Sequence, residues 1–226
     1  MVTCSNLQSV EDRYRDKYAK MALAITSTQL AKQNVVDEFG IGEDLPFMFM
    51  GWRGDRLVAL VGFCSEDMLK SVPERLPNVS KACTALRAMH WVDSITFVAE
   101  GYMSKEPFSL KGQELAAAFV DHDMKRVSEC LTASHLWINT KNQPQAMLMS
   151  TPYTYLLGRH IVWGDNSAYS SGIGHVLRDA PILVAVCNAL TDEVAHVTRD
   201  EYEEAWFALL EQGMSVTDFV EPPSVI

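Results

Sequence analysis

The sequence has no long apolar run. Its longest apolar stretches, Leu57 to Cys64 and Ile182 to Cys187, are far shorter than the ~20 residues that a membrane-spanning helix needs. The N-terminal residues also lack the apolar core of a secretory signal peptide. We therefore expect a soluble protein that resides in the cytoplasm and does not interact with a membrane.

Paired cysteines are also lacking. The sequence has five cysteines and contains no C-x-x-C motif. An odd number without short spacings argues against both a disulfide framework and a structural zinc site. Since the cysteines fall mostly within apolar stretches, they predict buried, reduced thiols of the kind found in a reducing compartment.

Basic residues are scarce at the C-terminal end of the chain. The formal net charge is −10, and residues 191–226 hold nine acidic residues and one arginine, a charge of −8, which leaves −2 for the first 190 residues. Such a chain would be repelled by a phosphate backbone, so we expect no nucleic-acid partner. The acidic end could instead attract a basic protein surface, with Glu203, Glu204, Trp206 and Glu211 as candidate partner-binding residues. A solvated helix face is the alternative.

The common catalytic and cofactor motifs are absent. Gly40-Ile41-Gly42 and Gly172-Ile173-Gly174 match only the start of a dinucleotide-binding loop, and neither follows a clear parallel strand. No G-x-S-x-G or H-E-x-x-H sequence occurs. The sequence therefore predicts no cofactor and favours a protein without catalytic activity.

Scattered acidic and imidazole side chains leave one enzymatic alternative. The weak catalytic candidates are Glu100, Asp121, His122, His160 and Asp165, and a metal could also draw on His175 and Asp179 as ligands. Consecutive residues of a helix point about 100° apart, so Asp121-His122-Asp123 cannot face one ion together. We therefore expect no metal site, and a metal-dependent hydrolase that uses residues between 121 and 179 is the alternative function.

Glu100 is the one carboxylate in the middle of a predicted strand, Ser94 to Met103. If it is buried, it must be paired or have a raised pKa, and either state can mark a functional site. Arg87, Arg159 and Tyr102 are candidate partners. The alternative is a water-facing residue on an edge strand, and the sequence does not decide between the two.

Helical periodicity predicts several helices. The first runs from Ser9 to about Asn34, with Tyr14, Tyr18, Met21, Ile25 and Thr28 on its inner face. Further along, Pro73 and Pro77 should interrupt a short helical turn, after which a stripe of Val79, Ala82, Cys83, Leu86 and Met89 indicates a helix to His90. A helix from Glu114 to about Leu131 should bury Leu115, Ala118, Phe119, Val127 and Leu131. Another starts near Thr198, buries Tyr202, Ala205, Trp206, Leu209 and Leu210, and ends at Gly213.

Strand signals are strongest around Arg53-Gly54-Asp55-Arg56. Two apolar segments flank this turn and predict a β-hairpin with Phe47, Phe49, Leu60 and Phe63 in the core. Three more strand-like pieces are Leu136 to Thr140, Ala146 to Ser150, and about Tyr155 to Trp163, and Ser167 to His175 resembles a loop. Residues 181–190 are compatible with a helix or a strand.

These elements predict one α+β domain with a mixed or mostly antiparallel sheet of about six strands and helices packed on it. Residues 1–40 would form the N-terminal helix, 45–190 the sheet core, 198–213 the acidic C-terminal helix and 214–226 an irregular tail.

The pattern over about residues 45–190 resembles a family of uncharacterised short proteins of actinobacteria and their phages. The similar features are the hairpin, the strand Ser94 to Met103, the helix start Gln113-Glu114-Leu115 and Thr151-Pro152-Tyr153. The connection Ser104 to Gly112 is shorter than in that family. The resemblance supplies no catalytic residue and implies a phage-type accessory protein of the host cytoplasm that binds a host or phage protein. A virion structural component and a homo-oligomer, such as a homodimer, are further alternatives.

Overall fold

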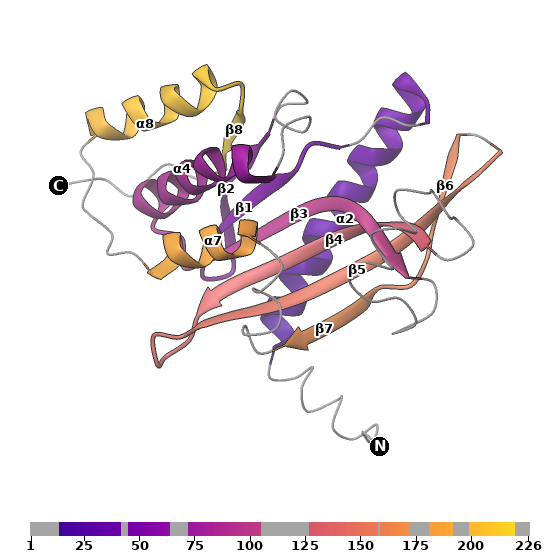
Figure 1. The fold of residues 1–226 in the computed structure, drawn as a ribbon, viewed down its shortest axis with the longest axis horizontal. Coiled ribbons are helices and arrows are strands. Elements are labelled where there is room, and N and C mark those ends of the chain that lie inside the picture. The colour runs from indigo at the N-terminus through magenta and orange to yellow at the C-terminus, as the bar shows by residue number, and fades with distance from the viewer. Residues whose placement is uncertain are drawn as a thin grey trace.

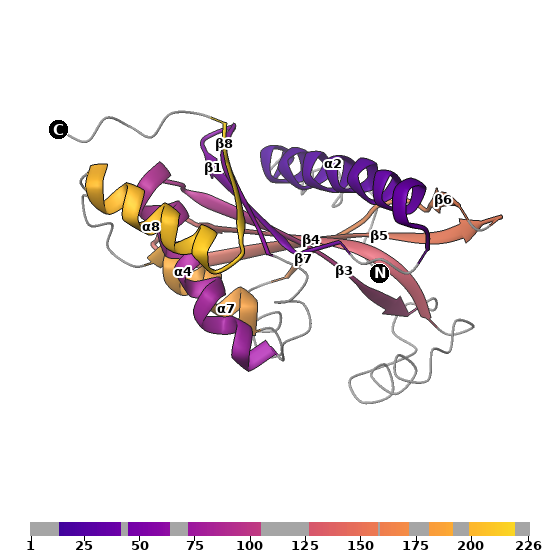
Figure 2. The same cartoon turned by 90° about the horizontal axis from the view of Figure 1, so that it is seen from above.

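The computed structural model of the chain describes residues 14–41, 45–63, 72–104, 127–157, 159–171, 181–191 and 199–219. Within these ranges eight strands form one sheet, and each strand pairing is antiparallel. Four helices of the same ranges cover both faces of the sheet (Figures 1 and 2). The α+β class predicted from the sequence is confirmed, and the sheet has more strands than expected.

The strands are β1 (Met48–Arg53), β2 (Arg56–Gly62), β3 (Ser94–Ser104), β4 (Val127–Ile138), β5 (Pro144–Leu156), β6 (His160–Trp163), β7 (Ser167–Ser171) and β8 (Ser215–Asp218). The helices are α2 (Arg15–Phe39), α4 (Val72–His90), α7 (Pro181–Thr191) and α8 (Arg199–Glu211). Neighbouring strands follow the order β6-β5-β4-β3-β1-β2-β8, and β7 also pairs with β5.

The β1–β2 hairpin confirms the strongest local prediction. Its two-residue turn places Gly54 at a φ of 56°, a conformation that glycine adopts without strain. Both strands lie inside the sheet, because β1 also pairs with β3 and β2 also pairs with β8. Phe47, Phe49 and Phe63 are buried in the core as expected, whereas Leu60 is only partly buried.

Two apolar cores lie on opposite faces of the sheet. Helix α2 packs on one face, and α4, α7 and α8 pack on the other, as Figure 2 shows with the sheet seen from its edge. The aromatic residues Phe47, Phe49, Phe63 and Phe97 contact one another on the α4 side. Met50 and Trp52, in the same strand as Phe49, belong to the core on the α2 side. Side chains of β1 therefore contribute to both cores.

Helix α2 differs from the expected N-terminal helix in its end and in its inner face. It continues past Asn34 to Phe39, while the expected start at Ser9 lies outside the described residues. Met21, Ile25 and Thr28 are buried as predicted, but Tyr18 is exposed and two lysines, Lys20 and Lys32, are buried. A pattern of apolar residues could not identify these lysines, because their burial depends on what the sheet places opposite them.

Helix α4 corrects the expected interruption by proline. Pro73 lies in the first helical turn, where a missing N–H costs no intrahelical hydrogen bond, and Pro77 lies inside the helix. Val79, Ala82, Cys83 and Leu86 are fully buried, as the stripe predicted. The helix therefore runs through Pro77 and buries this stripe against the sheet.

The expected helix from Glu114 to Leu131 is wrong at its C-terminal end. Residues 105–126 lie outside the described ranges, and Val127 begins β4, which pairs with β3 from Val127↔Ser104 to Trp137↔Ser94. The predicted strand Leu136 to Thr140 is the end of this longer strand. Helical periodicity misled here, since hydrogen bonds to β3 outweigh a local preference.

Three shorter corrections concern the end of the chain. The expected strand Tyr155 to Trp163 is a hairpin of β5 and β6, and Ser167 to Ser171, expected as part of a loop, is β7 on the free edge of β5. The expected irregular tail contains β8, which pairs with β2. In each case a distant strand supplies the hydrogen bonds that sequence composition does not reveal.

Residues 181–191 form α7, with Leu183, Val186, Cys187 and Leu190 buried.

Candidate functional site

Glu100 is buried and paired. Its side chain is 8% exposed, and its Oε1 lies 2.8 Å from Nζ of Lys32, which is 1% exposed. Tyr153 donates its hydroxyl proton to Oε1 at 2.7 Å, and the backbone N–H of Leu45 donates to Oε2 at 2.6 Å. The edge-strand alternative is therefore wrong. Sequence reasoning proposed Arg87, Arg159 or Tyr102 and missed these partners, because Lys32 and Tyr153 are distant in sequence.

The Lys32–Glu100–Tyr153 cluster is closed. Burial, followed by the charge of Glu100, raises the pKa of Tyr153, so its hydroxyl stays protonated and remains a donor. Burial also raises the pKa of the neighbouring Cys130 thiol to about 12. Because the carboxylate is already held by three donors, the cluster joins α2 to the sheet and offers no free group to a substrate.

A second lysine of α2 has a different environment. Lys20 is 5% exposed, and its Nζ donates to Oγ of Ser94 at 3.5 Å, the long limit of a hydrogen bond. The same Nζ lies 5.6 Å from the ring centroid of Trp52. No carboxylate in the described part of the chain forms an ion pair with Lys20. Burial, and then the charge of Lys17, lower its pKa.

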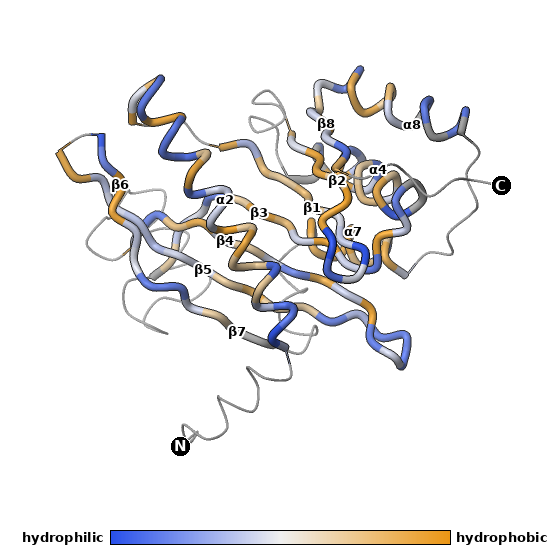
Figure 3. Tube along the Cα trace, turned by 180° about the vertical axis from the view of Figure 1, so that it is seen from behind, coloured by the Kyte–Doolittle hydropathy of each residue, from blue (hydrophilic) through white to orange (hydrophobic). Residues whose placement is uncertain are grey.

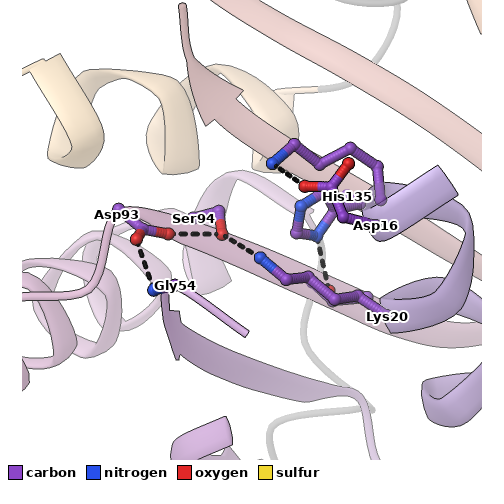
Figure 4. Close-up of polar contacts among 8 residues, drawn as sticks. Asp16, Lys20, Gly54, Asp93, Ser94 and His135 are labelled. Carbon is purple, nitrogen blue, oxygen red and sulfur yellow. Dashed lines mark hydrogen bonds and ion pairs between the residues drawn. The ribbon is translucent and has the colours of Figure 1, made fainter. Parts of the chain in front are cut away.

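The Ser94 contact is part of a short chain of hydrogen bonds (Figure 4). Ser94 donates to Oδ1 of Asp93 at 2.8 Å, and Oδ2 of Asp93 accepts from the backbone N–H of Gly54 at 2.6 Å. Ser94 therefore uses its oxygen to accept from Lys20. The chain connects the amine of α2 with the tip of the β1–β2 hairpin.

A pocket of about 530 Å³ opens beside Lys20. Lys20 and Trp52 line it together with Arg15, Asp16, Leu23 and Asp55. We call it the Lys20 pocket. It therefore combines a buried amine with charged groups of both signs and an apolar side chain.

His135 is buried with one ring nitrogen unpartnered. Its Nδ1 lies 2.8 Å from Oγ1 of Thr96, which accepts from the indole N–H of Trp52 at 2.8 Å, while Nε2 has no partner. Burial, and then the charges of Lys20 and Lys17, lower the pKa of His135 to about 3. His135 is therefore neutral throughout the physiological range.

Trp206 anchors α8 to the rest of the molecule. Its indole N–H donates to Oδ2 of Asp218 at 2.8 Å, and Oδ1 of Asp218 lies 2.7 Å from Nε2 of the buried His90. Burial lowers the pKa of His90 despite Asp218. The side chain of Trp206 is partly buried and packs against the core on the α4 side of the sheet, to which the buried Leu209 belongs.

The outward side of α8 carries both acidic and apolar residues. Glu203, Glu204 and Glu211 are exposed, as predicted for a solvated face. Phe207 is 63% exposed, and Leu210, expected on the inner face, is 48% exposed. Figure 3 shows apolar and polar positions alternating along this helix. The side chains of Tyr202 and Ala205, also expected on the inner face, are not among those that the structure describes.

Of the other catalytic candidates, the structure describes His160 and Asp165. His160 begins β6 and Asp165 follows its end, and both are exposed. Asp121, His122, His175 and Asp179 lie outside the described residues. Within the described ranges, no group of three or more His, Cys, Asp or Glu side chains could hold a metal ion. No observation therefore favours the hydrolase alternative.

Comparisons with known proteins add no relationship. No family model matches this chain, and neither the curated proteins nor the solved structures contain a match. In the described ranges no helix is long and apolar enough to cross a membrane. The resemblance to the actinobacteriophage proteins stays a prediction, and a functional proposal must rest on geometry and charge.

Proposed function

We propose that this protein acts by binding a basic protein partner through the outer side of α8, without catalysis. We call this region the α8 surface and define it as Glu203, Glu204, Phe207, Leu210 and Glu211. The supporting observation is the exposure of two large apolar side chains on a helix that also exposes five acidic residues, Asp200, Glu201, Glu203, Glu204 and Glu211. Exposed apolar residues with a charged border are typical of protein-binding sites.

Helical spacing places these groups on one side of α8. Glu203, Phe207 and Leu210 follow each other at i, i+4 and i+7, so they form one stripe, and Glu204 and Glu211 lie beside it. Trp206 and Leu209 face the core instead. A partner could therefore contact the stripe without disturbing the contacts that hold the helix in place.

The charge of α8 indicates the chemistry of the partner. Its sequence, RDEYEEAWFALLE, contains five acidic residues and one arginine. A complementary surface would carry lysine or arginine around an apolar centre, because opposite charges at the rim accelerate encounter and exclude acidic competitors. The proposal includes a cytoplasmic location in a phage-infected host. The buried free thiols of Cys83, Cys130 and Cys187 support the reducing compartment and do not bear on the host.

The test is site-specific photo-crosslinking in the native host, with the crosslinker at position 207 and a control crosslinker at the exposed Thr154 of β5. Position 207 should capture one protein whose crosslinked peptide is basic, and position 154 should not. With the purified partner, Glu203→Lys with Glu204→Lys should slow association and weaken its dependence on salt, while the melting temperature stays unchanged. The proposal would be contradicted if both positions captured the same protein equally, or if the crosslinked peptide of the partner were acidic.

A further inference from the structure

We propose that the Lys20 pocket binds a small organic carboxylate, with a carboxylate oxygen on Nζ of Lys20 and the apolar part of the ligand against Leu23. This site is separate from the α8 surface and does not depend on the function proposed for it.

The first argument is the incomplete hydrogen bonding of Lys20. An ammonium group has three N–H donors, and the hydrogen bond to Ser94 accounts for one of them at 3.5 Å. A buried charge without an acceptor is costly, and a bound anion removes that cost. Lys32 on the same helix shows the satisfied alternative, since Glu100 lies 2.8 Å away.

The second argument is that Lys20 lines an open pocket. Lys20 lines a pocket of about 530 Å³ although only 5% of the residue is exposed. This volume lies within the range of small-molecule sites. The pocket therefore has room for a ligand beside the one buried cation among its lining residues.

The charges around the pocket favour a carboxylate over a phosphate. Arg15 adds a second cation to the lining, while Asp16 and Asp55 add two acids. Lys17 neutralises Asp16 through an ion pair of 2.5 Å, which leaves Asp55 as the unpaired acid of the lining. Lys20 and Arg15 then exceed Asp55 by one positive charge. A monoanion balances this excess, whereas a dianion such as a phosphate monoester would leave a net negative charge beside Asp55.

Leu23 of α2 also lines the pocket and is half-exposed, so it gives the ligand an apolar contact. A small carboxylate with a branched alkyl chain therefore serves as the probe, and we choose 4-methylpentanoate. The uncharged 4-methylpentan-1-ol has the same carbon skeleton without the anion, and 3-methylbutyl phosphate carries the dianion.

The experiment is a calorimetric titration of the full chain with these three compounds. 4-Methylpentanoate should bind saturably below ~10 mM, more tightly than the phosphate, and the alcohol should not bind. Lys20→Met should weaken carboxylate binding at least about tenfold, whereas Lys141→Met, which removes an exposed lysine of the β4–β5 turn, should leave it unchanged. Arg15→Gln, at an exposed position, should weaken binding without touching the core.

Several results would overturn the proposal. They are carboxylate binding that is unaffected by both Lys20→Met and Arg15→Gln, equal binding of the alcohol, tighter binding of the phosphate, and no saturable binding of 4-methylpentanoate. Unfolding curves of each variant verify that it is folded before titration, and Arg15→Gln tests the anion contact even if Lys20→Met is unfolded.

Discussion

Lys20 and Lys32 lie on the same helix, α2, and face the same side of the sheet, yet their environments differ. Both are almost fully buried. Lys32 meets a carboxylate, a tyrosine hydroxyl donates to that carboxylate, and the cluster is complete. Lys20 meets a serine at a long distance and an open pocket. The comparison teaches that burial of a charged side chain has different consequences according to what lies opposite it.

The largest effect should follow the loss of Lys32. Lys32→Met leaves Glu100 buried without its cation, and breaking a buried pair in this way costs about 3–5 kcal/mol in the free energy of unfolding. Denaturant unfolding measures it. Adding Glu100→Gln to the same chain should recover part of the loss, because the unpaired charge disappears. A loss below about 1 kcal/mol would show that the pair is not a major contributor.

The next effect is the loss of stability in acid that the buried His135 should cause. The pKa of His135 is about 3 in the folded state and about 6.5 in an unfolded chain. Between these values the unfolded state binds the extra proton, so stability falls as the pH falls from 6.5 towards 3, by at most about 1.4 kcal/mol per pH unit from this residue. Unfolding curves across this range should be less steep in pH for His135→Gln. An unchanged slope would mean that other groups, such as His90, account for the acid sensitivity.

A smaller effect is expected at Tyr153, which tests whether the hydroxyl contributes to the Lys32 cluster. Tyr153→Phe removes the donor at 2.7 Å from Glu100 and keeps the ring. A hydrogen bond to a charged group is worth about 1.5–3 kcal/mol, so the variant should lose stability within that range. In the Lys32→Met background the same change should cost a different amount, since the two residues share one carboxylate. Additive losses would separate Tyr153 from the ion pair.

The smallest effect should follow the loss of Lys20. Lys20→Met removes a buried cation that has no carboxylate partner and replaces it with an apolar side chain of similar length. The free energy of unfolding should stay within about 1 kcal/mol of the parent or increase. A loss of unfolding free energy as large as that of Lys32→Met would contradict the difference between the two lysines, because Lys20 would then also stabilise the fold.

Part of the candidate sites could be predicted from the sequence. Glu100 stood out because a carboxylate in an apolar strand requires a partner, and the acidic helix stood out by its charge. Lys20 and Lys32 did not stand out, since a lysine in a helix usually faces water. Leu210 was assigned to the wrong side because Phe207 and Leu210 continue the apolar pattern of the inner residues without being buried.

The sequence by itself determined the elements that depend on neighbours along the chain. The β1–β2 hairpin follows from Gly54 between two apolar segments, and the end of α8 follows from Gly213, which has a φ of 79°. Only the tertiary structure decided that residues 127–135, Ser167–Ser171 and Ser215–Asp218 belong to strands and that Lys20 and Lys32 are buried. The physical reason is that their hydrogen bonds and charge partners come from residues far away in the chain, which no local pattern specifies.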